Sequence, residues 1–213
     1  AAASHEIRTP LNAIAGLTEL VLDGALPVDA REHLQTIQRA SQSLLAIVDG
    51  LLDFAKIEAG RLELVPSDVD LRQLLADTVR TFALQAEAKD LDLVVDVHWN
   101  VPDLVRADAA RLRQVVANLV GNAIKFTSSG EVVVSAAVEG GRVAVAVRDT
   151  GIGIGKEQVE RIFDPFRQAS ADTAQRFGGT GLGLSISRML VGLWNGRLSV
   201  FSEPGIGSRF VFD

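Results

Sequence analysis

A histidine beside a glutamate near the N-terminus could carry covalent phosphate chemistry. His5 is followed by Glu6, and Thr9 comes four residues after the histidine, on the same face of a helix. An exposed imidazole can attack a phosphorus atom with one nitrogen when a neighbouring carboxylate manages the proton on the other. His5 is therefore a candidate phosphate acceptor and Glu6 its candidate base. Taken alone, the pair is more simply interpreted as two surface residues of a helix.

A row of polar residues at helical spacing predicts a second kind of chemistry. Two asparagines in the middle of a helix need a reason, because asparagine is a poor helix former. Amide oxygens suit Mg²⁺, which takes few protein ligands and the rest from phosphate and water, and lysine offers charge to phosphate. A solvated helix face is the alternative interpretation. The row consists of Arg111, Gln114, Asn118, Asn122 and Lys125.

An aspartate at the end of a predicted strand is followed by two glycines. Asp149 has the parity of the valines before it, so its side chain should emerge on the buried face. A buried carboxylate needs donors, which the amino group of an adenine would supply. Gly151 and Gly153 would let the backbone approach a flat base closely. The alternative is a turn carboxylate that caps the residues after it.

A glycine-rich run precedes a segment that is predicted to be helical near 181–194. Exposed backbone N–H groups at a helix N-terminus favour a phosphate, and glycines can act as hinges of a lid. The polar segment 168–176 is the predicted lid, and Phe166 is one of its apolar anchors. The run lacks the lysine of a P-loop and a Rossmann context. It consists of Gly178, Gly179, Thr180, Gly181, Leu182 and Gly183.

The composition restricts the classes of function. Of 213 residues, 47% are hydrophobic and 23% are charged, so the chain can bury a core and is not disordered. A net charge of −6 argues against a nucleic-acid or acidic-lipid surface, and a nucleotide must bind through a local site. The absence of cysteine excludes disulfides and cysteine zinc sites.

The ends and the hydropathy of the chain suggest its setting. It opens inside a predicted helix and ends on an apolar strand, so we expect a fragment of a longer protein. No apolar run approaches the roughly 18 residues of a membrane span, and no signal peptide is visible. We expect this part of the protein to be cytoplasmic and to make no membrane contact.

The first third of the chain is predicted to form two helices, at about 4–23 and 29–59, joined by a short turn. A hairpin cannot bury an apolar heptad seam alone, so the pattern predicts a homodimeric four-helix bundle. Packing against the rest of the chain is the alternative. The seam of the second helix is Leu34, Ile37, Ser41, Leu44, Val48, Leu51 and Ala55.

The remaining two thirds are predicted to form one mixed sheet covered by helices. Asp108 is the predicted N-cap of a helix that runs to about 126, and a hairpin follows across two glycines. The other expected elements are a short strand at 61–66, a helix at 70–89, a strand at 91–97, a helix near 156–162 and closing strands at 197–202 and 208–212.

In their order and spacing, these motifs resemble the catalytic core of sensor histidine kinases of the hybrid type, over essentially the whole chain. The matches are His5 to Leu11 with the H-box, Asn118 to Thr127 with the N-box, Asp149 to Gly153 with the G1 box, Phe163 to Phe166 with the F-box and Gly179 to Gly183 with the G2 box.

The resemblance implies an α+β protein with two domains. Residues 1–62 would be a dimerisation and histidine-phosphotransfer hairpin, and 63–213 an ATP-binding α/β sandwich of the Bergerat (GHKL) fold. His5 would take the γ-phosphate of Mg-ATP, with Glu6 as base, and pass it to an aspartate of a response-regulator receiver domain. The Thr9 position would help to place water when the core acts as a phosphatase on that partner.

The resemblance also implies roles in nucleotide binding. Asn122, with Asn118 beside it, would hold Mg²⁺, and Lys125 would contact phosphate. Asp149 would bind adenine. Phosphoryl transfer of this kind rests mostly on positioning and charge stabilisation. The other residues expected at the nucleotide are Gly151, Gly153, Phe166, Gly179, Thr180, Gly181, Leu182 and Gly183.

Two further classes of function remain open. A GHKL ATPase could hydrolyse ATP to drive a conformational clamp, but a clamp needs no phosphate acceptor such as His5. A signalling module could bind ATP without kinase activity, and this fragment could be inactive in that way. The retention of His5, Asn122 and Asp149 argues against such decay.

Overall fold

The computed structural model describes residues 2–167 and 181–213, with side chains from residue 7 onward. The chain divides into two compact units, residues 1–62 and 63–213, which are described separately below. Within the part of the chain that is described, none of the helices combines the length and the apolar character that a bilayer crossing requires.

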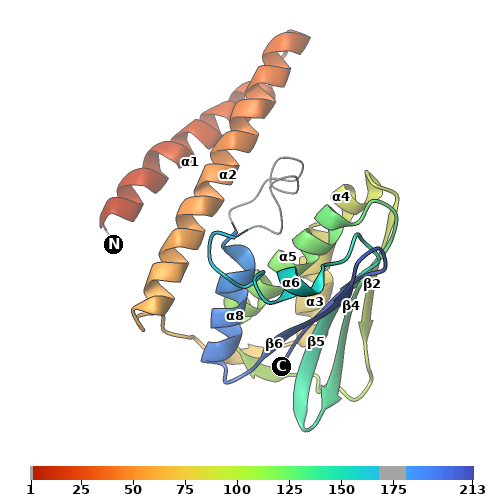
Figure 1. The fold of residues 1–213 in the computed structure, drawn as a ribbon. Helices are drawn as coiled ribbons and strands as arrows, with labels where there is room; N and C mark the ends of the chain where they lie inside the picture. Colours follow the sequence, from red (N-terminus) through yellow and green to blue (C-terminus); the bar gives the residue numbers. More distant parts are fainter. Residues whose placement is uncertain (1, 168–180) are drawn as a thin grey trace. The chain divides into compact units, whose positions relative to one another are not determined.

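The first unit is a helical hairpin of α1 (Ala2–Leu22) and α2 (Val28–Glu58), as expected (Figure 1). The Arg8 guanidinium donates to Asp49 Oδ1 from Nη2 at 2.6 Å and from Nε at 3.1 Å, which joins the two helices. Arg31 donates to the carbonyl oxygens of Leu22 and Gly24, both at 2.9 Å. Arg31 therefore satisfies one acceptor that the end of α1 would leave open, on Leu22, and one in the turn that follows.

Most of the predicted heptad seam is exposed in this hairpin. Ile37, Leu44 and Leu51 are 46%, 45% and 47% exposed, although Ser41 of the same seam is buried. The first helix buries Leu11 and exposes further apolar side chains. These are Ile7, Ile14, Leu17, Leu20 and Val21. The hairpin thus carries an apolar surface that its own two helices do not cover.

The second unit contains a mixed sheet of five strands, in the order β2-β4-β5-β7-β6. The strands β2 and β4 are parallel, and every other neighbouring pair is antiparallel. The predicted mixed sheet is therefore confirmed. The strands are β2 (Leu91–Val97), β4 (Gly130–Glu139), β5 (Arg142–Asp149), β6 (Leu198–Glu203) and β7 (Gly207–Phe212).

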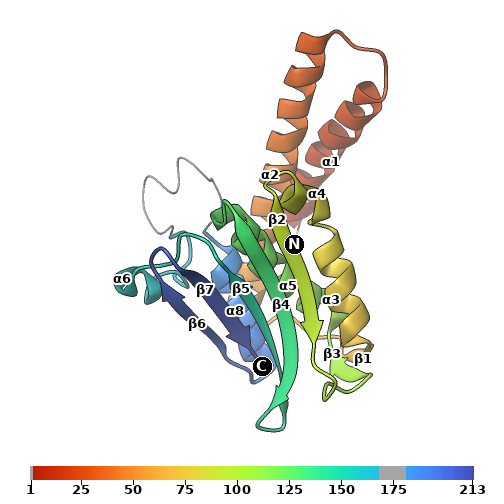
Figure 2. The ribbon, with the colours of Figure 1, turned by 90° about the vertical axis from the view of Figure 1, so that its right-hand side faces the viewer.

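Three helices cover one face of this sheet (Figure 2). They are α3 (Leu71–Arg80), α5 (Ala109–Phe126) and α8 (Gly183–Leu193). The central helix α5 contacts both of the others and lies over β4 and β5. Its Val115 and Val120 have no exposed surface, and neither do Val132 and Val134 of β4. The core therefore lies between α5 and the middle of the sheet, and the alternating pattern of β4 follows from it.

Two expectations about elements were wrong, and one strand was missed. The segment 61–66 forms no strand; the strand is β1 (Ser67–Val69), which pairs with β3 (Val105–Ala107), a strand that the pattern did not indicate. The helix expected at 70–89 is broken into α3 and α4 (Ala83–Glu87). Phe82 lies in the break, and its ring packs against Gly121 of α5. Tertiary packing therefore overrides the helical pattern there.

The predicted N-cap of α5 is confirmed. Asp108 Oδ1 accepts hydrogen bonds from the backbone of Ala110 and Arg111 at 3.1 Å, and Oδ2 accepts one from Val65 N at 3.0 Å. Burial raises the pKa of Asp108, but the bonds from Val65, Arg111 and Ala110 and the charge of Arg111 outweigh it, so the pKa lies below that of an ordinary aspartate. This carboxylate thus fixes both the start of α5 and the segment before β1.

Replacing this cap should destabilise the second unit more than replacing an ordinary cap. Asp108→Ala leaves three backbone donors without their acceptor, and should lower the free energy of unfolding by about 1–3 kcal/mol. Asp70, the cap of α3, accepts from Gln73 N, so Asp70→Ala is the matched control and should cost about 1 kcal/mol. Urea unfolding followed by far-UV circular dichroism measures both.

The effect should also depend on pH. Because the folded-state pKa of Asp108 is lowered, its contribution is complete above the ordinary aspartate pKa and disappears as pH falls through the lowered value. The difference between wild type and Asp108→Ala should shrink over that acidic range. Equal costs for the two caps at neutral pH would mean that the additional hydrogen bonds of Asp108, including the one from Val65, contribute nothing.

Candidate functional site

The predicted site residues belong to both units. His5, Glu6 and Thr9 lie on α1, where Thr9 is exposed; the side chains of His5 and Glu6 are among those not described. Asn118, Asn122 and the other predicted nucleotide residues belong to the second unit. Gly179, Thr180 and the predicted lid at 168–176 lie outside the described residues.

The end of α5 meets the loop that follows β5. Ile152 N donates to the carbonyl oxygen of Phe126 at 3.2 Å. A Cβ atom on Gly151 would lie 2.9 Å from the carbonyl carbon of Phe126, so this position has no room for a side chain. Gly153 has a φ of +68°, and a Cβ there would overlap the backbone of Glu203. Packing within the protein therefore already requires glycine at both positions, which the sequence analysis explained by the approach of a flat nucleotide base.

Asp149 is buried at the end of β5, as its parity predicts, with 7% of its surface exposed. The backbone N–H groups of Gly151 and Ser208 donate to its Oδ1 at 2.9 and 3.3 Å. Burial raises the pKa of Asp149, and the bonds from Gly151 and Ser208 only partly offset it. Such a carboxylate gains from a further donor, because a buried charge is costly until it is fully hydrogen-bonded.

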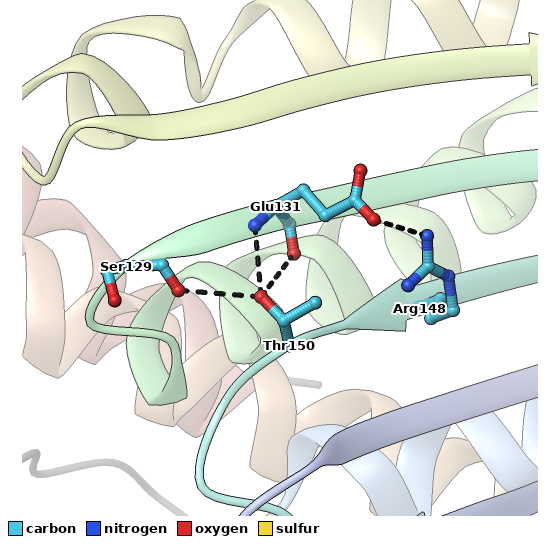
Figure 3. A network of polar contacts seen from close by, with 4 residues as sticks. All are labelled: Ser129, Glu131, Arg148 and Thr150. Carbon is cyan, nitrogen blue, oxygen red and sulfur yellow. Dashed lines mark hydrogen bonds and ion pairs between the residues drawn. The ribbon is translucent and has the colours of Figure 1, made fainter.

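Thr150 joins this loop to the segment that follows α5 (Figure 3). Its Oγ1 accepts a hydrogen bond from Glu131 N at 3.0 Å and lies 3.4 Å from the carbonyl oxygens of Ser129 and Glu131. The Arg148 guanidinium forms an ion pair with Glu131 at 2.6 Å beside it. The network ties the beginning of β4 to the end of β5 and so fixes the strand end that carries Asp149.

Asn118 and Gly183 fit together across two helices. The Asn118 side chain donates from Nδ2 to Ser187 Oγ at 3.0 Å. A Cβ on Gly183 would overlap the Asn118 amide and lie 2.8 Å from its Cγ. The glycine at the first position of α8 is therefore needed so that α8 can approach α5 this closely.

Lys125 lies one turn beyond Asn122, at the end of the polar row, and both side chains are partly buried. Burial lowers the pKa of Lys125, because removal from water disfavours the ammonium form. Its Nζ lies 4.9 Å from the centroid of the Phe126 ring. An anion beside Lys125 would favour the charged form and recover part of that cost.

Phe166 and Gly181 border the undescribed segment. Phe166 N donates to the carbonyl oxygen of Gly181 at 3.0 Å. Phe166 has a φ of +62°, which is rare for a bulky residue, and its side chain is 62% exposed. Arg188 of α8 donates to the carbonyl oxygen of Phe163 at 3.2 Å and lies over the Phe163 ring.

Sequence reasoning missed the hydroxyl partners of the site. The Ser187 hydroxyl accepts from the amide of Asn118, and Ser208 of the neighbouring strand β7 binds Asp149 through its backbone N–H and also through its side chain. Ser187 lies one helical turn after Gly183, on the face that meets α5, so its spacing was a usable signal. Ser208 could be found only from the pairing of β5 with β7, which opposes it to Asp149.

The described residues offer no cluster of three or more histidine, cysteine, aspartate or glutamate side chains that could hold a metal ion. The amide oxygens of the polar row on α5 are groups that could hold a cation together with a bound phosphate and water. Mg²⁺ is commonly bound in that manner.

Comparison with known proteins covers both units. Residues 107–213 match the family described as histidine kinase-, DNA gyrase B- and HSP90-like ATPase, and residues 1–60 match the His Kinase A (phospho-acceptor) domain. The chain is 45% identical over 214 residues to the signal transduction histidine-protein kinase BarA of Escherichia coli K12. It is 43% identical over 212 residues to the sensor protein GacS of Pseudomonas syringae pv. syringae.

These matches cover 98% and 97% of this chain and 23% of each relative, so the chain spans about a quarter of their length. The hybrid signal transduction histidine kinase A of Dictyostelium discoideum is 37% identical over 222 residues, which cover 99% of this chain and 10% of that protein.

Solved structures agree with the fold. Full-length ShkA in complex with AMPPNP superposes with a TM-score of 0.82 at 35% identity, over 99% of this chain and 44% of that one. The histidine kinase AdeS of Acinetobacter baumannii, at 23% identity and a TM-score of 0.70, shows the same fold over 98% of this chain and 95% of its own. With an ATPase match over half its length and a phospho-acceptor match over the hairpin, the chain belongs to the sensor histidine kinases and is the catalytic core of an ATP-dependent protein-histidine kinase.

Proposed function

We propose that this core phosphorylates its own His5 from Mg-ATP and passes the phosphoryl group to an aspartate of a receiver domain. Residues 1–62 dimerise and accept the phosphate, and residues 63–213 bind the nucleotide. The observation that carries the proposal is the convergence of three separate motifs in the second unit. The loop after Asp149 contacts the end of α5, and Asn118 of α5 contacts Gly183 of α8.

Asp149 binds the adenine in this proposal. Its Oδ1 accepts backbone hydrogen bonds from Gly151 and Ser208, and the Ser208 side chain also binds the carboxylate. The two oxygens of a carboxylate together accept about four hydrogen bonds, so there is capacity for a further donor such as the exocyclic amino group of the base. The raised pKa of the buried carboxyl supports the same role, because an added donor would stabilise the ionised form. Gly151 and Gly153 keep the backbone beside it free of side chains.

Asn122 is the proposed ligand of Mg²⁺, and Lys125 the proposed contact of the phosphates. The amide of Asn118 is engaged by Ser187 and packs against Gly183, which favours Asn122 as the ligand and gives Asn118 a supporting role. A single amide oxygen fits an ion that arrives with the phosphates of its nucleotide. Bound there, Mg²⁺ would neutralise part of the negative charge of the triphosphate.

The transfer step follows from the chemistry of imidazole. One nitrogen of His5 forms a bond to the γ-phosphorus while the bond from that phosphorus to the bridging oxygen of ADP breaks, and ADP leaves. Glu6 accepts the proton of the other nitrogen, so that the ring does not accumulate charge. In the second step a carboxylate oxygen of the receiver bonds to the phosphorus while the bond from phosphorus to the His5 nitrogen breaks, and Glu6 returns the proton to the ring, which restores neutral His5.

A homodimer is proposed from the exposed seam of the hairpin. Ile37, Leu44 and Leu51 lie one heptad apart on α2 and are each nearly half exposed. A second hairpin that covers them would complete a four-helix bundle. Removing this apolar surface from water supplies the driving force for association.

The first experiment is incubation with γ-labelled ATP and Mg²⁺. Wild type should acquire label that is lost in acid and kept in alkali, whereas His5→Ala should acquire none. Asn122→Ala should label at least about 100-fold more slowly, because a ligand of the charge-neutralising ion is gone. The exposed Asn195 is the control, and Asn195→Gly should label at the wild-type rate.

Each outcome decides one assignment. Full retention of the labelling rate in Asn122→Ala would reject its role as the metal ligand. A wild-type chain that binds ATP and takes no label would instead be an ATP-binding module that is inactive as a kinase.

The adenine assignment makes a separate prediction. Asp149→Asn should weaken ATP binding by more than about 1 kcal/mol, roughly fivefold, because the charged acceptor of the amino group is lost. The exposed Asp92 of β2 is the control, and Asp92→Asn should leave the affinity unchanged. Isothermal titration calorimetry measures both.

The same assignment predicts a pH dependence. Because the pKa of Asp149 is raised, its ionised fraction falls at a higher pH than for an ordinary aspartate. The affinity advantage of wild type over Asp149→Asn should therefore shrink as pH is lowered toward that value. An advantage that stays constant, or no advantage at all, would contradict the contact.

Thr9 is proposed to place the water that removes phosphate from the partner. Its side chain is exposed one helical turn after His5. Thr9→Ala should slow dephosphorylation of a receiver domain about tenfold or more, while autophosphorylation stays within about twofold. The receiver is chosen from a panel of purified domains as one that takes label from this core. An equal loss of both activities would reject the division of roles.

A further inference from the structure

Lys89 holds the end of α5 from a distant part of the chain. It lies in the turn between α4 and β2, and its side chain is partly buried. The ammonium group donates to the carbonyl oxygens of Ile124 at 2.7 Å, Lys125 at 3.1 Å and Thr127 at 3.2 Å. An ammonium group has three donors, and all three are used here.

These bonds complete the termination of α5. The last four carbonyl groups of a helix have no partner within it. Ala123 O accepts from Thr127, both from the backbone and from Oγ1, and Phe126 O accepts from Ile152 N. The remaining two, on Ile124 and Lys125, are the ones that Lys89 binds. A positive charge at this end also complements the helix dipole.

The turn that Lys89 holds is the one that carries Asn122 and Lys125 and receives the loop after Asp149. We propose that Lys89 is a positioning residue for the nucleotide: it fixes the last turn of α5 in the register that ATP requires, without touching ATP. This inference rests on the proposed function, which places the phosphates and the metal ion at that turn.

The physical argument is preorganisation. Without Lys89 the partly buried carbonyl groups of Ile124 and Lys125 lose their donor, and the last turn of α5 can relieve them only by fraying or by admitting water. Asn122 and Lys125 would then have to be ordered by the nucleotide, at the expense of its binding free energy. A merely structural residue would change the stability of the unit and leave this affinity unaffected.

Arg72 provides the matched control. Its guanidinium also holds backbone carbonyl groups, those of Val97 at 2.8 Å and His98 at 2.9 Å, at the opposite end of β2 from Lys89. Arg72→Met and Lys89→Met each remove a cation that binds main-chain oxygen atoms. The oxygen atoms that Lys89 binds belong to the turn that carries the polar row, whereas those that Arg72 binds do not.

The test measures the affinity of each full chain for AMPPNP with Mg²⁺ by calorimetry, together with the urea midpoint of unfolding. Both variants should unfold at lower urea than wild type. Lys89→Met should bind AMPPNP about tenfold more weakly, and Arg72→Met within about twofold of wild type. Lys89→Arg, which keeps the charge and the donors, should recover part of the affinity.

Equal affinities for Lys89→Met and Arg72→Met would overturn the inference and leave Lys89 as a stabilising residue only. A wild-type chain that fails to bind AMPPNP would reject the proposed function itself, which is a separate result. If Lys89→Met does not fold, Lys89→Gln, which retains an amide donor, is compared with Arg72→Gln under the same criterion.

Discussion

The termination of α5 is the constraint on which the catalytic unit depends. A helix that ends inside a fold cannot give its last carbonyl groups to water, so each needs a protein donor. Here the donors come from Thr127 directly after the helix, from Lys89 before the sheet begins and from Ile152 after β5. Three segments far apart in sequence are thus bound to one helical turn, and the polar row of α5 ends there.

The sequence could predict those features of the fold that depend on residues close together along the chain. Asp108 was recognisable as a cap because its Oδ1 accepts from backbone N–H groups only two and three residues further along the chain, and the burial of Asp149 followed from strand parity. The break between α3 and α4 was not predictable in that way. It depends on the packing of Phe82 against Gly121, which are joined only by the fold.

The same distinction between features set by nearby residues and features set by the fold applies to the candidate site. The residue types of Asn118, Asp149 and Gly183 indicated nucleotide chemistry, and family membership supports it. Their immediate partners could not be predicted, because Ser187 and Ser208 reach the site through helix packing and strand pairing. His5, the proposed phosphate acceptor, belongs to a separate compact unit, and no pattern within one unit predicts how it would reach the nucleotide.

The fit of Gly183 against Asn118 has a consequence for how such sequences can diverge. The amide of Asn118 fills the space that a side chain at position 183 would need, so neither position can change independently of the other. A larger residue at 183 would be tolerated only beside a smaller one at 118, and that smaller residue would forfeit the bond to Ser187. Among proteins that keep this helix crossing, the two positions should therefore be inherited as a pair.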